Sequence, residues 1–373
     1  MGTIFQFPYR TVVEISIPSL MKNLYTLRTI SQREVIPVIK ADAYGHGMLP
    51  IGRALLKRGS CHTLAVATLE EAIDLRKHLP HGLTILVLSG FFPHQLEAYT
   101  KYRLVPVLHT LNHLRSLLGR KQLPEFHLKL DTGMHRLGLT EDQIGEAIKL
   151  LEKMEVKLAG VETHLAESES ALSTFADEQL EVFDRMLTQL RENRLVQTDA
   201  KIHVANSGGI LRAKWGKSVA VRPGLSLYGI SPNPRLARSS ELIPILEWKT
   251  RIIAVKDLKR NDTVGYGRTY KAKRKEKIAI LPIGYADGYP RLLSNVGEVL
   301  LAGKRVPVRG IVSMDLTAID CTQIPTKEGA LVTLIGGTGK ESLSIWELAN
   351  WAQTLPYEVF CGISARVPRV YLD

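Results

Sequence analysis

One lysine follows directly after a short run of β-branched residues and comes just before a glycine turn. The run extends from Val35 to Ile39, Lys40 ends it, and the chain then turns at Gly45 and Gly47. A strand followed by a glycine turn is typical of a site built where a sheet ends. Burial among apolar neighbours would disfavour the charged form of Lys40, so this lysine could form a Schiff base or act as a base in proton transfer. The alternative is an ordinary lysine whose ammonium reaches solvent at a strand end.

Further residues with chemical potential lie at the ends of other predicted strands. In chain order they are Lys129 with Arg136, His164, Asn206 with Ser207, and Arg222 with Gly224. Each has a structural alternative: His164 as a hydrogen-bonded core histidine, Ser207 as a helix cap, and Arg222 as a salt-bridge partner. Because all of them fall at strand ends together, the joint pattern favours one shared site.

Residues 205–209 (ANSGG) are predicted to open a helix with small side chains. Backbone N–H groups and the Ser207 hydroxyl could therefore approach an anion, and Gly224 and Leu225 could add backbone donors. This spacing suits a single phosphate monoester better than a dinucleotide.

Eight short β-rich runs alternate with helical patterns in the first part of the chain. The predicted strands are 34–40, 63–68, 83–89, 104–109, 125–131, 156–164, 201–206 and 219–222. This count predicts a (β/α)₈ TIM barrel, in which reactive residues gather at the carboxyl ends of the strands. An open doubly wound sheet is the alternative, but it would need fewer strands and usually a G-x-G-x-x-G motif, which the sequence lacks.

Near residue 242 the pattern changes to short β-rich runs divided by Gly, Pro and Asp turns. These runs are 246–255, 277–283, 298–302, 306–320 and 330–335, and helical patterning is confined to 344–353. The predicted fold class is α/β plus all-β, with a barrel over residues 17–241 followed by a mainly β-strand C-terminal domain over residues 242–373.

Composition narrows the class of protein. A length of 373 residues suggests about two domains, and 45% hydrophobic with 23% charged residues indicates a soluble globular chain. The net charge of +12 could suggest nucleic acid, but the densest basic run, residues 271–277, has no interleaved aromatics and no binding motif accompanies it. We therefore expect no nucleic-acid partner.

The cysteines, the first residues and the apolar runs predict the cellular compartment. Cys61, Cys321 and Cys361 lack metal-ligand spacing and suggest reduced thiols. Residues 1–10 show no signal-peptide pattern, and no apolar run is long enough to span a bilayer. We expect a cytoplasmic protein without a membrane partner and without a metal.

The residues singled out above lie in motifs that resemble those of alanine racemases, which carry pyridoxal 5′-phosphate (PLP), over nearly the whole chain. In the first domain the motifs are VIKADAYGHG at 38–47, KLDTGMHRLG at 129–138, TH at 163–164, ANS at 205–207 and VRPG at 221–224. In the second they are VGYGRT at 264–269, IGYADGYPR at 283–291, SMD at 313–315, PYE at 356–358 and CGISARVP at 361–368. Leu165, where phenylalanine is common, and His135, where many members carry glycine, are local departures.

The resemblance implies a PLP-dependent racemase that interconverts L-alanine and D-alanine with two bases. Lys40 would attach the cofactor and serve as one base, and Tyr266 would serve as the other. His164 would contact Tyr266, and Arg222 would contact His164 and face the pyridine nitrogen. The cofactor-binding set implied is Lys40, Tyr44, His164, Asn206, Ser207, Arg222, Gly224, Leu225 and Tyr357.

For the substrate, the resemblance implies that Arg136 and the Met314 N–H bind the carboxylate. Tyr285 and Tyr357 would narrow the entrance. Lys129 would be carbamylated, as N-carboxylysine, and the resulting anion would orient Arg136; an unmodified lysine is the alternative.

The resemblance also implies a homodimer with shared active sites, because Tyr266, Tyr285 and Met314 would reach the partner subunit's barrel. A first strand at residues 10–16 would pair with the C-terminal domain. If D-alanine is the product, its role would be supply for peptidoglycan.

Three rival functions remain. A racemase of different specificity, for example for serine, would use the same residues, since one hydroxyl is worth only about 1–3 kcal/mol in such a pocket. A PLP-dependent decarboxylase is disfavoured by the Arg136 carboxylate clamp and by Tyr266. A non-catalytic PLP carrier of single-barrel type would lack the second domain with its matched tyrosines.

Overall fold

The computed structural model describes residues 9–170, 172–236, 238–338 and 341–373, which form two compact units. The barrel unit comprises Pro18–Ala43 and Met48–Pro244. The β unit comprises Ile245–Asp373, the segment Tyr44–Gly47 and the described residues that precede Pro18. Residues 1–8, most of the segment inspected for a signal peptide, lie outside the described residues.

The barrel unit contains an eight-stranded parallel sheet in the order β2-β9-β8-β7-β6-β5-β4-β3. Its strands are β2 (Glu34–Val35), β3 (Thr63–Val66), β4 (Thr84–Val87), β5 (Val105–Leu108), β6 (His127–Lys129), β7 (Leu158–Glu162), β8 (Val196–His203) and β9 (Ala220–Val221). A parallel bridge between Val38 and Ala65 joins the two ends of this order and closes the sheet on itself. The predicted TIM-barrel fold is confirmed.

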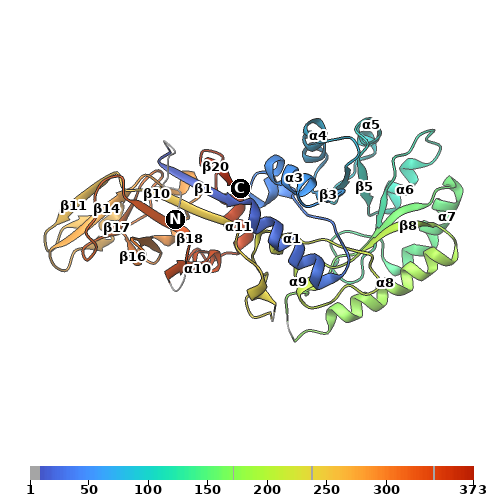
Figure 1. Cartoon of the computed structure of the whole chain (residues 1–373). Coiled ribbons are helices and arrows are strands. Elements are labelled where there is room, and N and C mark those ends of the chain that lie inside the picture. Colours follow the sequence, from blue (N-terminus) through green and yellow to red (C-terminus); the bar gives the residue numbers. More distant parts are fainter. Residues whose placement is uncertain (1–8, 171, 237, 339–340) are drawn as a thin grey trace. The chain divides into compact units, whose positions relative to one another are not determined.

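Helices lie outside the strands of this unit (Figure 1). They are α1 (Ile17–Ser31), α3 (Met48–Lys57), α4 (Leu69–His78), α5 (Leu96–Lys101), α6 (Leu111–Leu117), α7 (Ile144–Met154), α8 (Phe175–Glu192) and α9 (Ser207–Leu211). On α7 the buried residues Ile144, Ala147 and Leu151 repeat at helical spacing, so one apolar stripe faces the core. All residues of β3 and β5 are buried, as expected for parallel strands covered on both faces.

The first predicted strand, 34–40, is shorter than expected. β2 ends at Val35 because Pro37 has no N–H to donate to a ladder. Ladder bonds nevertheless continue, since Val38 N–H donates to Pro223 and Ile39 N–H donates to Ala65. Lys40 therefore does not end a regular strand; it begins α2 (Lys40–Tyr44), a short turn of unusual backbone.

The β unit is built on a ten-stranded sheet in the order β11-β14-β17-β16-β15-β18-β10-β1-β20, with β19 paired to β18. Its strands are β1 (Thr11–Ser16), β10 (Leu246–Arg251), β11 (Ala254–Leu258), β14 (Glu276–Leu281), β15 (Glu298–Leu301), β16 (Lys304–Arg309), β17 (Thr317–Asp320), β18 (Leu331–Thr338), β19 (Glu341–Leu343) and β20 (Arg369–Leu372). β12 (Thr263–Val264) and β13 (Tyr270–Lys271) form a separate hairpin. The pairs are antiparallel except β1 with β20, so this unit is the predicted β-rich one.

Two details of the β unit differ from the prediction. The single run expected at 306–320 is divided into β16 and β17 by a loop that contains Met314. Besides α10 (Ile345–Trp351), a second helix, α11 (Pro356–Gly362), carries Tyr357. This helix is too short for an apolar period to reveal it, although Pro356 at its first position was an available start signal.

Candidate active site

Lys40 stands at the start of a left-handed backbone turn. Ala41, Asp42 and Ala43 have φ angles of 52°, 53° and 54°, a region that costs about 1–2 kcal/mol for each non-glycine residue. The carboxylate Oδ1 of Asp42 accepts a hydrogen bond from the Met48 N–H at 2.7 Å, which ties the turn to the start of α3. The turn fixes the direction in which the half-buried Lys40 leaves the barrel.

Glu71, in the first turn of α4, holds this turn from the other side. Its Oε1 accepts from the Ala41 N–H at 2.6 Å, and its Oε2 accepts from the Ala67 N–H at 2.8 Å and the Thr68 N–H at 3.2 Å. Thr68 completes a capping box with Glu71. One carboxylate thus joins the residue after Lys40 to the end of β3. Our sequence analysis missed Glu71, although the Thr68-x-x-Glu71 capping signal was readable.

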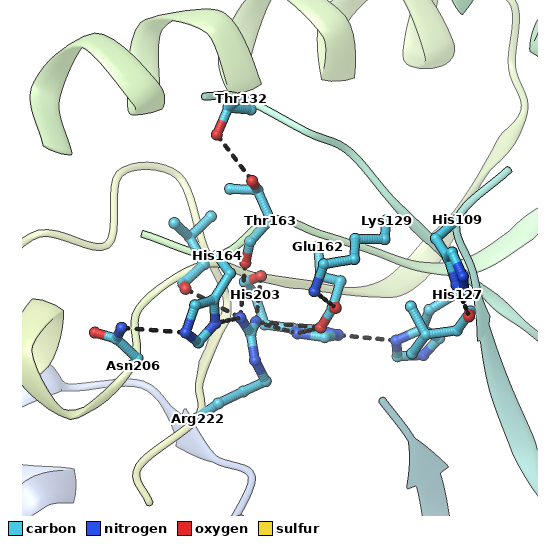
Figure 2. Close-up of polar contacts among 12 residues, drawn as sticks. His109, His127, Lys129, Thr132, Glu162, Thr163, His164, His203, Asn206 and Arg222 are labelled. Carbon is cyan, nitrogen blue, oxygen red and sulfur yellow. Dashed lines mark hydrogen bonds and ion pairs between the residues drawn. The ribbon is translucent and has the colours of Figure 1, made fainter. Parts of the chain in front are cut away.

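Arg222, just after β9, has several polar contacts with groups at the neighbouring strand ends (Figure 2). It is 3% exposed. One guanidinium nitrogen donates to the His203 carbonyl at 2.6 Å and contacts the His203 ring Nδ1 at 2.5 Å. The other donates to the carbonyls of Thr163 at 2.7 Å and Val204 at 3.2 Å, and lies 3.4 Å from His164 Nδ1. Groups at the ends of β7 and β8 therefore fix the guanidinium of a residue that follows β9.

His164 and Asn206 extend this group toward the anion-binding segment. The Asn206 amide nitrogen lies 3.4 Å from His164 Nε2, and its Oδ1 accepts from the Gly209 N–H at 3.0 Å and so caps α9. Burial, and then the nearby Arg222 cation, hold the pKa of His164 well below its usual value. His164 is therefore neutral at neutral pH.

Lys129 and Glu162 form a buried ion pair on neighbouring strands (Figure 2). Lys129 Nζ lies 2.8 Å from Glu162 Oε1, and the two side chains are 8% and 0% exposed. Glu162 Oε2 lies 3.3 Å from His203 Nδ1 and 3.5 Å from an Arg222 nitrogen. Burial would raise the pKa of Glu162, but the Lys129 and Arg222 cations outweigh it and hold that pKa well below its usual value. Glu162 is a carboxylate.

His203 also contacts His127, so the polar cluster extends to His127 on β6. The Nδ1 atom of His203 lies 2.5 Å from an Arg222 nitrogen and 3.3 Å from Glu162 Oε2, and its Nε2 lies 2.8 Å from His127 Nδ1. Burial, and then the Arg222 cation, lower the pKa of His203 to about 4, and burial with His203 lowers that of His127. Both rings are neutral. The sequence analysis missed Glu162, His203 and His127 because no local motif connects them.

The Ser207 hydroxyl oxygen is surrounded by hydrogen-bond donors. This oxygen accepts from the N–H groups of Gly224 and Ser226, both at 3.1 Å, and from the Ser226 hydroxyl at 2.9 Å. A Cβ on Gly208 would lie 2.6 Å from the Ser168 hydroxyl, so a small residue is required there. Leu225, at the start of a 3₁₀ turn, is buried beside this group. The predicted phosphate residues Ser207, Gly224 and Leu225 are brought together.

Arg136 lies in the loop after β6, and its charge contributes to the lowered pKa of His164. Asp131 shapes the loop, since its Oδ1 accepts from the N–H groups of Gly133, Met134 and His135 at 3.0–3.1 Å. Arg136 is exposed, and within the described ranges it forms no salt bridge.

In the β unit, Tyr44 and Tyr357 lie together. Their ring centroids are 5.9 Å apart. Burial, with a smaller contribution from Tyr357, raises the pKa of Tyr44, so its hydroxyl keeps its proton. The segment around Tyr44 is fixed because Arg369 donates to the Gly45 carbonyl at 3.1 Å and Tyr371 donates to that of His46 at 3.0 Å.

The other predicted residues of the β unit are exposed. Tyr266, Tyr285 and Met314 are 75%, 45% and 53% exposed. Tyr285 and Met314 belong to joined loops, since the Tyr285 N–H donates to the Ser313 carbonyl at 3.1 Å and the Ala286 N–H to that of Met314 at 3.0 Å. Tyr266 follows Gly265, whose φ of 71° requires a glycine-like backbone.

Outside the few residues left undescribed, no group of His, Cys, Asp and Glu side chains is arranged to hold a metal ion. None of the helices in the described part of the chain is long and apolar enough to cross a membrane.

A closed parallel barrel with a lysine after its first strand, buried cations at its strand ends and a separate β unit defines a class of two-domain barrel proteins. The family described as "Alanine racemase, N-terminal domain" matches residues 15–232, and that described as "Alanine racemase, C-terminal domain" matches residues 245–371. The chain therefore belongs to the alanine racemase family, and it is an enzyme of the isomerase class.

Individual relatives cover the chain almost completely. The alanine racemase of Halothermothrix orenii is 39% identical over 97% of this chain and 96% of its own. The solved alanine racemase of Bacillus anthracis with bound L-Ala-P is 32% identical, with a TM-score of 0.88 over 99% and 96% of the two chains. That of Bartonella henselae, with covalently bound pyridoxal phosphate, is 29% identical, with a TM-score of 0.87 over 98% and 100%.

Proposed function

We propose that this protein interconverts L-alanine and D-alanine with PLP as its cofactor. The observation that carries the proposal is the barrel arrangement itself. Lys40 follows the first strand of the barrel. His164 and Arg222, which contact each other, follow two later strands, and the Ser207 hydrogen-bond group follows the strand between them. The relatives that bear the name alanine racemase, and the one with covalently bound pyridoxal phosphate, support it.

The residues present suit a phosphate-bearing pyridine cofactor. Two backbone N–H groups and a hydroxyl donate to Ser207 Oγ. Groups of these kinds are the hydrogen-bond donors that commonly bind a phosphate. We propose that Ser207, Gly224, Leu225, Tyr44 and Tyr357 hold the phosphate and that Asn206 and His164 line the ring. The barrel domain, 17–241, would thus bind the cofactor.

PLP, when bound, supplies an electron sink for the negative charge that forms at Cα when its proton leaves. Racemisation then needs one group on each face of Cα. We propose that Lys40 Nζ holds or moves the proton on one face and that the Tyr266 hydroxyl does so on the other. The left-handed turn held by Glu71 would fix the approach of Lys40.

Arg222 would set the electrostatics of the pyridine nitrogen. Its guanidinium is held by three carbonyls and by Glu162, and it stays a cation in a buried site. A fixed cation opposes protonation of a facing ring nitrogen. This limits delocalisation of the Cα charge and so suppresses side reactions such as transamination.

For the substrate, we propose that Arg136 and the Met314 N–H bind the carboxylate, since a guanidinium fork matches its two oxygens. Tyr285 and Tyr357 would restrict the side chain to a methyl group. Since Tyr266, Tyr285 and Met314 are exposed in the β unit, we propose that they complete the site of a partner subunit in a homodimer. The C-terminal domain, 242–373 with strand 10–16, would carry this second function.

We further propose that the enzyme works in the cytoplasm and supplies D-alanine for peptidoglycan. The decisive experiment is deuterium wash-in at Cα of L-alanine in D₂O, together with an absorbance spectrum of the purified protein. A PLP band with label in both enantiomers supports a racemase. A PLP band without exchange, or no PLP band, would refute the proposal.

A further inference from the structure

The barrel contains one carboxylate placed between two buried cations. Glu162 lies 2.8 Å from Lys129 Nζ and 3.5 Å from an Arg222 nitrogen, and its side chain is 0% exposed. His203 and His127, which complete the cluster, are neutral. In the described part of the chain, no other carboxylate forms an ion pair with Lys129 or Arg222.

This environment opposes carbamylation of Lys129. Carbamylation joins Nζ of a neutral amine to the carbon of CO₂ and releases one proton, and the product carries a negative charge. An ammonium paired with a carboxylate has no lone pair for that bond. The product would also place a second anion against Glu162 in a buried site, which is costly for like charges.

We infer that Lys129 remains an unmodified ammonium and that Glu162 supplies the permanent buried anion of this site, acting as a positioning residue for Lys129 and Arg222. Unlike a carbamate on Lys129, which forms only when CO₂ is available, the Glu162 carboxylate is always present. Lys129 and Arg222 hold the pKa of Glu162 well below its usual value, so Glu162 stays ionised and can serve as this anion. The part of the inference that concerns Arg222 and PLP rests on the proposed function; the part that concerns the Lys129–Glu162 pair does not.

The first test asks whether Lys129 carries a carbamate. Carbon-13 NMR of the purified full-length protein in ¹³C-bicarbonate, without alanine, is recorded for the wild type and for Lys129→Gln. We expect identical carbamate signals, since only other amines would contribute. A wild-type signal that is absent in Lys129→Gln would overturn the inference.

The second test asks whether Glu162 acts as the counter-ion. We expect Glu162→Gln and Lys129→Gln each to lower the midpoint of thermal unfolding. The double variant should recover part of the Glu162→Gln loss, because Lys129 no longer remains as an unpaired cation and only Arg222 lacks its carboxylate. Equal substitutions at the more exposed pair of Glu34 and Lys201 are the matched control and should change little. A double variant no more stable than the sum of its single changes would refute the pairing.

The third test addresses positioning. We expect Glu162→Gln to lower kcat about 10–100-fold with little change in KM for alanine and to shift the absorbance maximum of bound PLP, with partial rescue in Glu162→Asp. An unshifted spectrum with normal kcat in a folded variant would overturn the positioning role. If the wild-type protein does not racemise alanine, the proposed function fails, whereas the NMR and unfolding results still decide the ion pair.

Discussion

The barrel cluster and the exposed tyrosines of the β unit contrast sharply in how their polar groups are held. Arg222 is 3% exposed and bonded to three carbonyls at the ends of two strands, β7 and β8. Tyr266 is 75% exposed on a turn set by glycines. A buried, fully bonded group contributes to folding as well as to chemistry, whereas an exposed one contributes almost nothing to folding. The two regions should therefore respond differently to substitution.

The largest effect is expected at Lys40, which belongs to the barrel yet is only half buried. Lys40→Ala should remove the PLP absorbance band and lower racemisation by about 10⁴-fold or more, because one residue would both attach the cofactor and move a proton. The hydrogen bonds that hold the left-handed turn are made by Ala41 and Asp42 and not by the Lys40 side chain. The midpoint of thermal unfolding should therefore change little in Lys40→Ala. Racemisation assays and thermal unfolding test this, with the exposed Lys256→Ala as control. Retention of the band in Lys40→Ala would contradict the assignment.

Tyr266→Phe should separate activity from stability most clearly. Loss of one proton-transfer group should lower kcat about 10²–10⁴-fold. Because the ring is exposed, the free energy of unfolding should stay within about 0.5 kcal/mol of the wild type. Tyr25→Phe, also exposed, is the control for loss of a surface hydroxyl. A large loss of stability in Tyr266→Phe would erase the contrast between the two regions.

The buried histidines should make the stability of the barrel depend on pH. His203 in the fold has a pKa of about 4, because of burial and the Arg222 cation, whereas an unfolded histidine titrates near 6.5. Between these values the unfolded chain binds more protons, so this contribution is complete above about pH 6.5 and is lost as the pH falls toward 4. Its size is on the order of 3 kcal/mol.

Unfolding in denaturant at a series of pH values measures this dependence. His203→Gln should be less stable at pH 7 and should show a shallower fall below pH 6.5. The exposed His62→Gln should keep the wild-type slope. A wild-type slope in His203→Gln would show that other groups carry the dependence.

The smallest effect concerns the clamp on the left-handed turn. Glu71→Ala leaves three backbone N–H groups without their carboxylate, so a loss of about 1–2 kcal/mol in the free energy of unfolding is expected. Glu70→Ala, at the neighbouring exposed position, is the control. Hydrogen exchange at the Ala41 amide should rise in Glu71→Ala only. Unchanged exchange there would show that the turn does not depend on Glu71.

Much of the fold and part of the site could be predicted from the sequence. The barrel strands alternate with helices at regular spacing, and Lys40, Ser207 and Arg222 stand out because polar residues at strand ends are conspicuous beside apolar runs. Helix α11 and the exact end of β2 could not be predicted, since a helix of one or two turns has no period and Pro37 ends the assigned strand but not its hydrogen bonds.

The sequence by itself determined which residues are available for chemistry and, through local periodicity, the strands and helices that carry them. The tertiary structure alone decided their charges. Glu162 contacts Lys129 across 33 positions of sequence and His203 contacts His127 across 76, and only closure of the barrel brings these groups into one buried region. Because the energy of a buried charge depends on its neighbours within a few ångströms, no local pattern could have shown that Glu162 is ionised and the histidines are neutral.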